Sequence, residues 1–238
     1  MNTGTTQAKM FLADDRGLHQ TARFQSRHTF NFGSYQQEHK QPFNNMYVWN
    51  DDVLDAGCSV RMSIEERSWV VLLPVIGAIA YKDSLQRESL PAAGQVQVLL
   101  LNKGDSMEIA NPFAEGLVNF LQVWIRTDDN DGNETATPFT YDVNANINSM
   151  FAIHEASSFI ISIGKFEGRG ETVYHTKNKS SPVFLFVLEG VFEAEGRLLH
   201  ARDGLALQNI SSIEMEALSN DAIILAIETN IFCKAIVP

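Results

Sequence analysis

The chain has 238 residues, of which 45% are hydrophobic and 20% charged, and this composition is typical of a globular protein with a substantial buried core. Its formal net charge is -11, because 29 acidic residues outnumber 18 basic ones. Such a surface repels a polyphosphate backbone, so we expect no direct binding to nucleic acid. The longest apolar run, residues 70–80, is interrupted by Pro74 and Gly77. About twenty apolar residues are needed to cross a bilayer, so no membrane helix is expected.

The first residues and the cysteines predict a compartment. The start, MNTGTTQAKMFLADDRG, has no basic segment followed by an apolar core and a cleavage site, so no secretory signal is expected. Cys58 and Cys233 are too few for a disulfide framework or a structural zinc site. We therefore expect a cytoplasmic protein with both thiols reduced.

Short apolar runs rich in Val, Ile and Phe alternate with turn sequences along the first half of the chain, and no helical stripe persists for three turns. The turns carry Gly and Pro, as in PAAG and NKGD. The strands predicted in this half are Met46–Asn50, Trp69–Leu73, Ala78–Lys82, Val96–Leu101, Ser106–Ala110 and Asn119–Arg126. Their spacing is that of a β-sandwich or β-barrel.

Residues 127–138, TDDNDGNETATP, hold four acidic residues and no large apolar side chain, which is typical of a solvated linker or long loop. We place the domain boundary there, with one domain at residues 1–130 and a second at 131–238. The strands predicted beyond it are Ser149–Ile153, Phe159–Phe166, Glu171–His175, Val183–Leu188, Val191–Ala194, Leu205–Gln208, Ser212–Ala217 and Ala222–Glu228. The second half is therefore β-rich as well.

An internal repeat in the sequence indicates a duplication. The segments VVLLPVIGAIAYKD and VFLFVLEGVFEAEG each run two strands through a Gly, and each is followed by a Gly-containing turn. Two tandem β-barrels produce such a repeat. The alternative is that any two antiparallel hairpins look alike at this level.

Three segments carry a family resemblance. Residues 27–57 contain H-T-F-N-F and then N-D-D, residues 77–84 read GAIAYKDS, and residues 120–125 read FLQVWI. They resemble the pirin family, which has H-T-F-x-F, a later N-E/D-D, G-x-L-x-H-x-D-S and F-L-Q-I-W-I. Pirins are bicupins, so the resemblance implies an all-β fold of two cupin barrels with few short helices.

The resemblance also indicates where a metal would bind. Metal-bearing pirins hold one ion, usually iron, in the first barrel through an H-x-H pair before the matched hairpin and an H-x-E pair before the matched F-L-Q strand. Gapless counting from the shared segments places these four positions on Ser63, Glu65, Met107 and Ile109. A transition metal needs three or four imidazole or carboxylate donors, so we expect neither a metal nor another cofactor.

Two alternatives stay open at this point. A shift of one residue would bring Glu66 and Glu108 to the ligand positions, which would make a weak site made of oxygen donors alone. In the second barrel the equivalent positions carry no histidine, and His175 lies one position away from the inferred register. A lone histidine on a strand is more often structural than a ligand.

The alternation of side chains along a strand predicts which residues occupy the place of the family's metal site. Arg61, Ser63, Glu65 and Arg67 share one face in this reading, and the resemblance places that face inside the barrel. An Arg–Glu arrangement would then occupy the cavity, with the apolar residues at the H-x-E positions as the facing wall. The alternative is that the strand ends near Ser63 and that both arginines are exposed.

These expectations favour a non-catalytic bicupin that binds a small molecule in a barrel cavity or acts through a protein partner. The alternative is a quercetinase-type dioxygenase with a non-standard metal site, because some pirins resemble quercetinases. A regulatory protein acting through protein contacts is also compatible with the net charge. The oligomeric state and the identity of the ligand do not follow from the residues.

Overall fold

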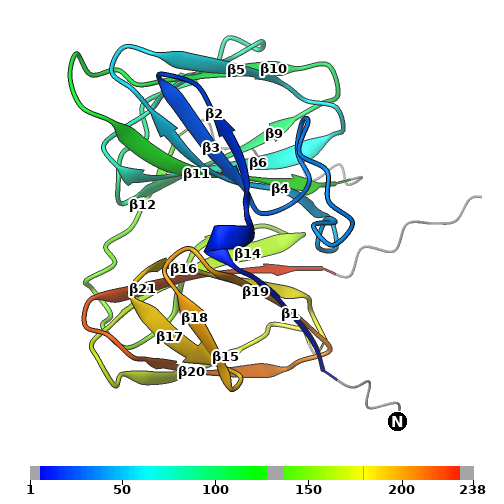
Figure 1. Cartoon of the computed structure of the whole chain (residues 1–238), viewed down its shortest axis with the longest axis vertical. Helices are drawn as coiled ribbons and strands as arrows, with labels where there is room; N and C mark the ends of the chain where they lie inside the picture. The colour runs from blue at the N-terminus through cyan, green and yellow to red at the C-terminus, as the bar shows by residue number, and fades with distance from the viewer. Residues whose placement is uncertain (1–5, 128–136, 179, 231–238) are drawn as a thin grey trace, which may run out of the picture. The chain divides into compact units, whose positions relative to one another are not determined.

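The computed structural model describes residues 6–127, 137–178 and 180–230. Nearly all regular structure in these ranges is β-strand (Figure 1). One 3₁₀ turn, Ala13–Asp15, is the sole helical element in the described ranges, and they contain no helix that could cross a membrane. Most of the expected linker and Cys233 lie outside the described residues, whereas Cys58 is a free, half-buried thiol.

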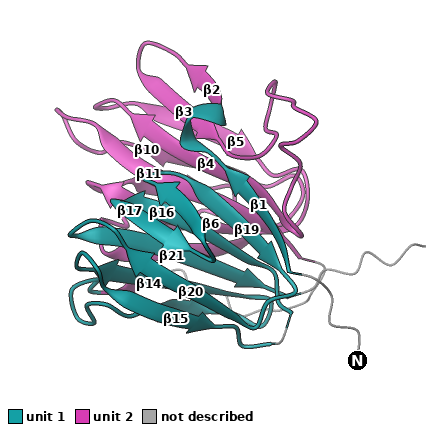
Figure 2. Cartoon of the chain, turned by 60° about the horizontal axis from the view of Figure 1, so that its bottom comes forward, with its two compact units in different colours: residues 1–15, 142–238 teal, residues 16–141 magenta. Residues whose placement is uncertain are grey.

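The chain forms two compact units (Figure 2). We call residues 16–141 the N-terminal unit and residues 1–15 with 142–238 the C-terminal unit. The sequence prediction had placed residues 1–130 in the first domain. The difference arises because β1 (Gln7–Phe11) pairs with β19 (Gly204–Gln208), whereas β12 (Phe139–Thr140) pairs with β9 (Gln95–Leu101).

The N-terminal unit contains a seven-stranded antiparallel sheet in the order β12-β9-β6-β11-β4-β3-β2 and a four-stranded sheet in the order β5-β10-β7-β8. The further strands are β2 (Gly17–Gln20), β3 (Phe24–His28), β4 (Met46–Leu54), β5 (Ser59–Ser63), β6 (Ser68–Ile76), β7 (Ala80–Asp83), β8 (Glu88–Ser89), β10 (Ser106–Ala110) and β11 (Val118–Arg126).

The C-terminal unit repeats this topology, with a six-stranded sheet β1-β19-β16-β21-β14-β13 and a four-stranded sheet β15-β20-β17-β18. Its further strands are β13 (Phe151–Glu155), β14 (Phe159–Phe166), β15 (Glu171–His175), β16 (Val183–Glu189), β17 (Val191–Ala194), β18 (Arg197–His200), β20 (Ser212–Ala217) and β21 (Ala222–Thr229). Every strand predicted from the sequence is present. The short strands β2, β3, β8, β12 and β18 and the edge strand β1 were not predicted. β5, which was expected to continue to Arg67 or to end near Ser63, ends at Ser63.

A glycine joins the two sheets at the same place in each unit. Gly77 follows β6 with a φ of +79°, and Gly190 follows β16 with a φ of +80°, a region that L-residues rarely adopt. A Cβ at Gly190 would also lie 2.7 Å from the Cβ of Ala222. These are the glycines at the centre of the two repeated segments, VVLLPVIGAIAYKD and VFLFVLEGVFEAEG.

Each unit has its own hydrophobic core between its two sheets. In the N-terminal unit this core includes Leu72, Ile109, Phe120 and Trp124, all almost fully buried. In the C-terminal unit the core includes strand residues such as Leu185. Both cores come from alternate residues of the strands, because successive side chains point to opposite faces of a sheet.

Candidate functional site

Three polar side chains form a row across the inner face of the large sheet in the N-terminal unit. His28 of β3 lies opposite Asn50 of β4, and Asn50 lies opposite Gln122 of β11. All three are buried. They share the face of the core residues Val48 and Trp124, because residues two apart on a strand point the same way. We call His28, Asn50 and Gln122 the polar row.

The polar row is one wall of a cavity of about 290 Å³. The other lining residues are His19, Phe24, Ser26, Phe32, Gly33, Ser34, Val60 and Met62. Val60 and Met62 come from β5 in the small sheet, so the cavity lies between the two sheets of this unit. The exposed His19 and Ser34 lie at its opening. A largely apolar cavity with a few convergent polar groups is the usual form of a small-molecule site.

Hydrogen bonding defines the protonation of His28. Its Nδ1 lies 2.9 Å from Oδ1 of Asn50. An amide oxygen only accepts, so Nδ1–H donates and Nε2 keeps its lone pair. Burial lowers the pKa of His28, the hydrogen bond with Asn50 opposes this, and the nearby His19 lowers the pKa further. His28 is therefore a neutral imidazole at neutral pH.

Asp52 lies next to the polar row on the same face of β4 and is fully buried. Burial raises its pKa to about 7, against hydrogen bonds from Ser26 and Gln122, and the neighbouring Asp51 adds to the rise. Nε2 of Gln122 donates to Oδ2 of Asp52, and Nε1 of Trp124 donates to Oε1 of Gln122 at 3.2 Å. These bonds hold the Gln122 amide in one orientation.

Two polar atoms on this wall are not hydrogen-bonded. Among the described residues, neither Nδ2 of Asn50 nor Oδ1 of Asp52 has a partner, although both are buried. A buried donor without a partner costs about 1–3 kcal/mol. The wall therefore has hydrogen-bonding capacity that the described protein groups leave unused.

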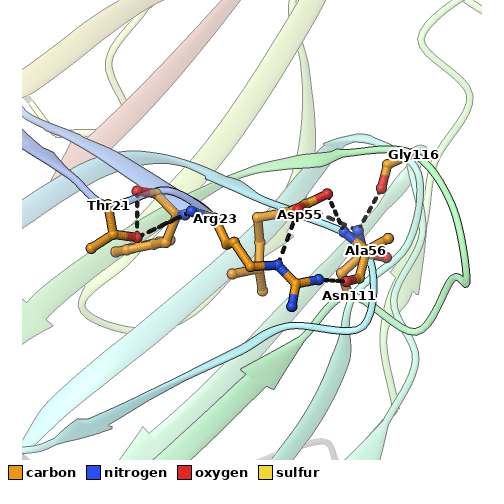
Figure 3. Close-up of polar contacts among 8 residues, drawn as sticks. Thr21, Arg23, Asp55, Ala56, Asn111 and Gly116 are labelled. Carbon is orange, nitrogen blue, oxygen red and sulfur yellow. Dashed lines mark hydrogen bonds and ion pairs between the residues drawn. The ribbon is translucent and has the colours of Figure 1, made fainter.

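A clamp beyond the end of β4 supports the register of this wall (Figure 3). Arg23 donates from Nε to Oδ2 of Asp55 at 3.1 Å and from Nη2 to the carbonyl oxygen of Ala56 at 2.6 Å. Asn111 donates to the carbonyl oxygens of Leu54 and Gly116. The clamp joins the start of β3 to the end of β4, and this register places His28 opposite its partner.

The structure corrects the orientation predicted for β5. Ser63, Glu65 and Arg61 are exposed, and Arg61 pairs with the Glu108 carboxylate at 3.3 Å on the outer face. The inward residues of β5 are the even-numbered ones, including Met62. Gapless counting was wrong because a turn at residues 64–67 separates β5 from β6 and interrupts the alternation.

The other predicted positions are divided between core and turn. Met107 and Ile109 are buried in the core and pair directly with Met62 and Val60 across β5 and β10. Arg67 is half-buried in the turn before β6 and does not line the cavity, so the predicted arginine–glutamate arrangement inside the barrel is wrong. Hydrocarbon and thioether groups occupy this wall instead.

This pair of strands does not fit a transition-metal ion. Divalent iron needs converging imidazole or carboxylate groups, whereas β5 and β10 present alkyl groups and the soft thioethers of methionine. No group of three or more His, Cys, Asp and Glu residues is placed to share an ion anywhere in the described ranges. The exposed Glu66 bonds to Arg126 and stays outside the barrel.

Sequence reasoning missed the polar row. His28 belongs to the H-T-F segment of the family resemblance, and its side chain lines the cavity. A signal was present: Asn50 and Asp52 stand two apart within MYVWNDDVL, and Gln122 interrupts the apolar FLQVWI. Polar residues on the inward face of a strand cost energy unless they are paired, so they mark a site.

Comparisons with known proteins agree with this architecture. Residues 147–229 match the family model of the quercetinase C-terminal cupin domain. The chain is 25% identical over 211 residues to a pirin-like protein of Caulobacter vibrioides, covering 84% of this chain and 90% of that protein. The chain is therefore similar to pirin-like cupins over most of its length.

Two Escherichia coli proteins extend the comparison of this pirin-like bicupin. A quercetin 2,3-dioxygenase is 25% identical over 118 residues, about half of each chain. The crystal structure of YhhW superposes with a TM-score of 0.82 at 18% identity, covering 96% of this chain and 100% of that one. This second likeness shows the shared fold. A YhhW structure is also described in complex with nickel(II).

Proposed function

We propose that this pirin-like bicupin binds a small molecule in the cavity of its N-terminal unit and performs no metal-dependent catalysis there. The observation that carries the proposal is the contrast between the two cavity walls. Val60 and Met62 form an apolar wall on the β5 side, and the polar row forms the other. Such a cavity can bind and orient a ligand, but its apolar wall has no group that activates dioxygen.

The proposal accounts for the buried polar groups. Asn50 is held by His28 on β3, and Gln122 by Asp52 on β4 and by Trp124 on its own strand, so the polar row is preorganised before any ligand arrives. Asn50 also keeps an unpaired donor at a site that is nearly closed to water.

Elemental analysis of the purified, tag-free protein tests the absence of a metal. The protein is incubated separately with iron, manganese, zinc, copper and nickel salts, dialysed extensively and measured for metal per chain. Oxygen uptake with quercetin is recorded on the same samples. We expect well below one ion per chain and no uptake above buffer.

One tightly held ion per chain would overturn the proposal. Oxygen uptake that depends on that ion would then favour the alternative, a dioxygenase of the kind named for the Escherichia coli relative. A matched control is Glu65→Gln, because this exposed carboxylate lies at a position first expected to face a metal. Metal content that falls in this variant would restore the register predicted from the sequence.

A further inference from the structure

A second cavity lies in the C-terminal unit, at the same place in the topology as the first. It has a volume of about 420 Å³. Its walls include β13 and β14 at one edge of the large sheet and β15 at one edge of the small sheet. In the N-terminal unit, the corresponding strands β3, β4 and β5 line the first cavity. The repeated topology therefore produces two cavities, and the proposed function uses only the first.

The two cavities differ in chemistry. Val60 and Met62 of β5 make one wall of the first cavity apolar. In the second cavity, β15 presents Thr172 and Tyr174 instead, and Glu228 of β21 also lines it and is 3% exposed. The described residues that line the first cavity include no Asp, Glu, Lys or Arg. The second cavity therefore suits a different class of ligand.

The carboxylate of Glu228 is fixed by donors from β15 and from the loop after it. The backbone N–H of Lys177 donates to both carboxylate oxygens at 3.0 Å, and that of Asn178 donates to Oε1 at 3.3 Å. The hydroxyl of Tyr174 donates to Oε2, also at 3.3 Å. A carboxylate accepts about four hydrogen bonds, so these three donors leave about one acceptor position.

No basic side chain neutralises Glu228 within the described ranges, because its hydrogen bonds come from backbone N–H groups and a phenol. Lys177 also lines the cavity, but its ammonium pairs with Glu155 at 2.9 Å, and the lining His175 is exposed. Burial raises the pKa of Tyr174 to about 12, and the charge of Glu228 adds to the rise, so the phenol stays neutral. A charge removed from water is stabilised by an opposite charge, so this cavity favours a cation.

The outer face of the adjoining small sheet carries the same sign of charge. Glu171 lies opposite Glu216, and Glu216 lies opposite Glu193, an arrangement of like charges that is destabilising. Arg169 pairs with Glu216 and offsets part of this charge. The matching row of the N-terminal unit alternates in sign, with Arg61, Glu108, Lys82 and Glu88. Val173 lines both the hollow on the acidic face and the cavity, so the acidic field raises the concentration of cations near the cavity.

The rest of the lining favours an organic cation over a metal ion. Met150, Ile160 and Tyr174 line the cavity beside the hydroxyl groups of Ser162 and Thr172. Aromatic faces attract organic cations, thioethers pack against their carbon atoms, and hydroxyl oxygens accept hydrogen bonds from an ammonium group. In the part of the chain that the structure describes, no three His, Cys, Asp or Glu residues are grouped to share a metal ion.

We propose that the cavity of the C-terminal unit binds a small organic ammonium ion, with the ammonium group at Glu228 and the carbon body against Met150 and Ile160. The ligand class is a primary amine with an aromatic or short aliphatic body. This site is additional to the cavity of the proposed function and does not depend on it. The donors that hold Glu228 orient the carboxylate before the ligand arrives, which lowers the entropic cost of binding.

Three probes of similar size and different charge test the inference by NMR at pH 7. Benzylamine is a cation at this pH, benzyl alcohol is neutral and benzoate is an anion. We expect the wild-type protein to bind benzylammonium about tenfold more tightly than benzyl alcohol, the effect of one hydrogen bond to a charged group, and to bind benzoate most weakly. In isotope-labelled protein, the backbone amide signals of Lys177 and Asn178 should shift most, because these N–H groups bond to Glu228.

Three variants locate the site. Glu228→Gln keeps the size of the side chain and removes its charge, so it should weaken benzylammonium binding about tenfold and change benzyl alcohol binding less than about twofold. Glu167→Gln, the same change at an exposed position of the same unit, is the matched control and should change neither. Ala152→Trp, at an exposed position of β13 that lines the cavity, should weaken the binding of every probe because the added ring occupies the space.

The outcomes separate this inference from the proposed function. Equal binding of the three probes, or tighter binding of benzoate, would overturn the ligand class. No binding of benzylammonium would overturn the site and leave the proposed function standing. Amide shifts confined to the N-terminal unit would also overturn the site, and they would support the cavity of the proposed function. If Glu228→Gln does not fold, the ratio between benzylammonium and benzyl alcohol on the wild-type protein, together with the amide shifts, decides the question.

Discussion

At the scale of single residues, the N-terminal unit carries polar groups where its strands otherwise carry apolar ones. Asn50, Asp52 and Gln122 are each at most 1% exposed, and all face the inside of the barrel. Burying such groups costs free energy unless partners satisfy them, and two atoms on this wall have none within the described ranges. These groups therefore lower the stability of the fold, which agrees with the proposed role of this wall in binding a ligand.

Asp52 makes the stability of the protein depend on pH. Its pKa rises from 3.8 to about 7 on folding, mainly through burial. The folded state therefore binds this proton more tightly than the unfolded state. The bound proton stabilises the folded state at low pH, and this stabilisation is lost as the pH rises through this range. We expect Asp52→Asn to remove this dependence and to raise the free energy of unfolding at pH 8 by up to about 4 kcal/mol, which is what a pKa rise of about three units corresponds to.

Urea denaturation at intervals between pH 4 and pH 8 measures the effect of Asp52→Asn. Asp14→Asn is the control, because Asp14 is exposed and its substitution should leave the profile parallel to that of the wild type. If the Asp52→Asn profile also runs parallel to the wild type, Asp52 is ionised in the folded protein and does not act as described.

At the scale of elements, the pairing of β5 with β10 decides what the small sheet presents to the cavity. Val60 and Met62 face inward opposite Ile109 and Met107, so their exposed neighbours carry the charges. A shift of one residue would reverse both faces. The register is favoured because it turns four apolar side chains toward the core, Met107 and Ile109 fully buried and Val60 and Met62 partly buried.

Two substitutions test this register. Met107→Ala should lower the free energy of unfolding by about 2–4 kcal/mol, because it leaves a cavity in a closely packed core. Glu65→Gln should change it by less than about 0.5 kcal/mol, because the side chain is exposed. Urea denaturation of both variants checks the prediction, and a large cost for Glu65→Gln together with a small one for Met107→Ala would contradict the register.

At the scale of the whole molecule, the N-terminal strand completes the C-terminal unit. β1 pairs along its full length with β19, and Phe11 packs against Phe184 with ring centroids 5.7 Å apart. β12 occupies the matching edge position beside β9 in the N-terminal unit. Each unit therefore adds, at the same sheet edge, a strand from a different part of the chain.

Phe11→Ala tests the assignment of β1 to the C-terminal unit. The loss of this buried ring should cost about 3–5 kcal/mol. Trp49, Trp69 and Trp124 all lie in the N-terminal unit, so tryptophan fluorescence follows that unit alone. We expect urea unfolding measured by far-UV circular dichroism to begin earlier in the variant, while the tryptophan transition keeps its midpoint. A tryptophan midpoint that shifts as far as the circular dichroism midpoint would contradict the assignment.

The sequence by itself determined the fold class, most of the long strands and the resemblance to the pirin family. Runs such as residues 159–166 and 183–189 are apolar enough to be buried on both faces, and turn residues bound them, so local chemistry alone defines them. The pirin-like segments are continuous in the chain, and a continuous match needs no knowledge of tertiary contacts.

Only the tertiary structure decided the position of β1, the inward face of β5 and the composition of the site. β1 joins β19 across almost 200 residues, and pairing at that distance leaves no local pattern. The face of β5 depends on one turn that gapless counting could not include. His28, Asn50 and Gln122 come from three strands and become neighbours only through strand register, so the sequence showed single polar residues on apolar strands and only the structure assembled them into one site.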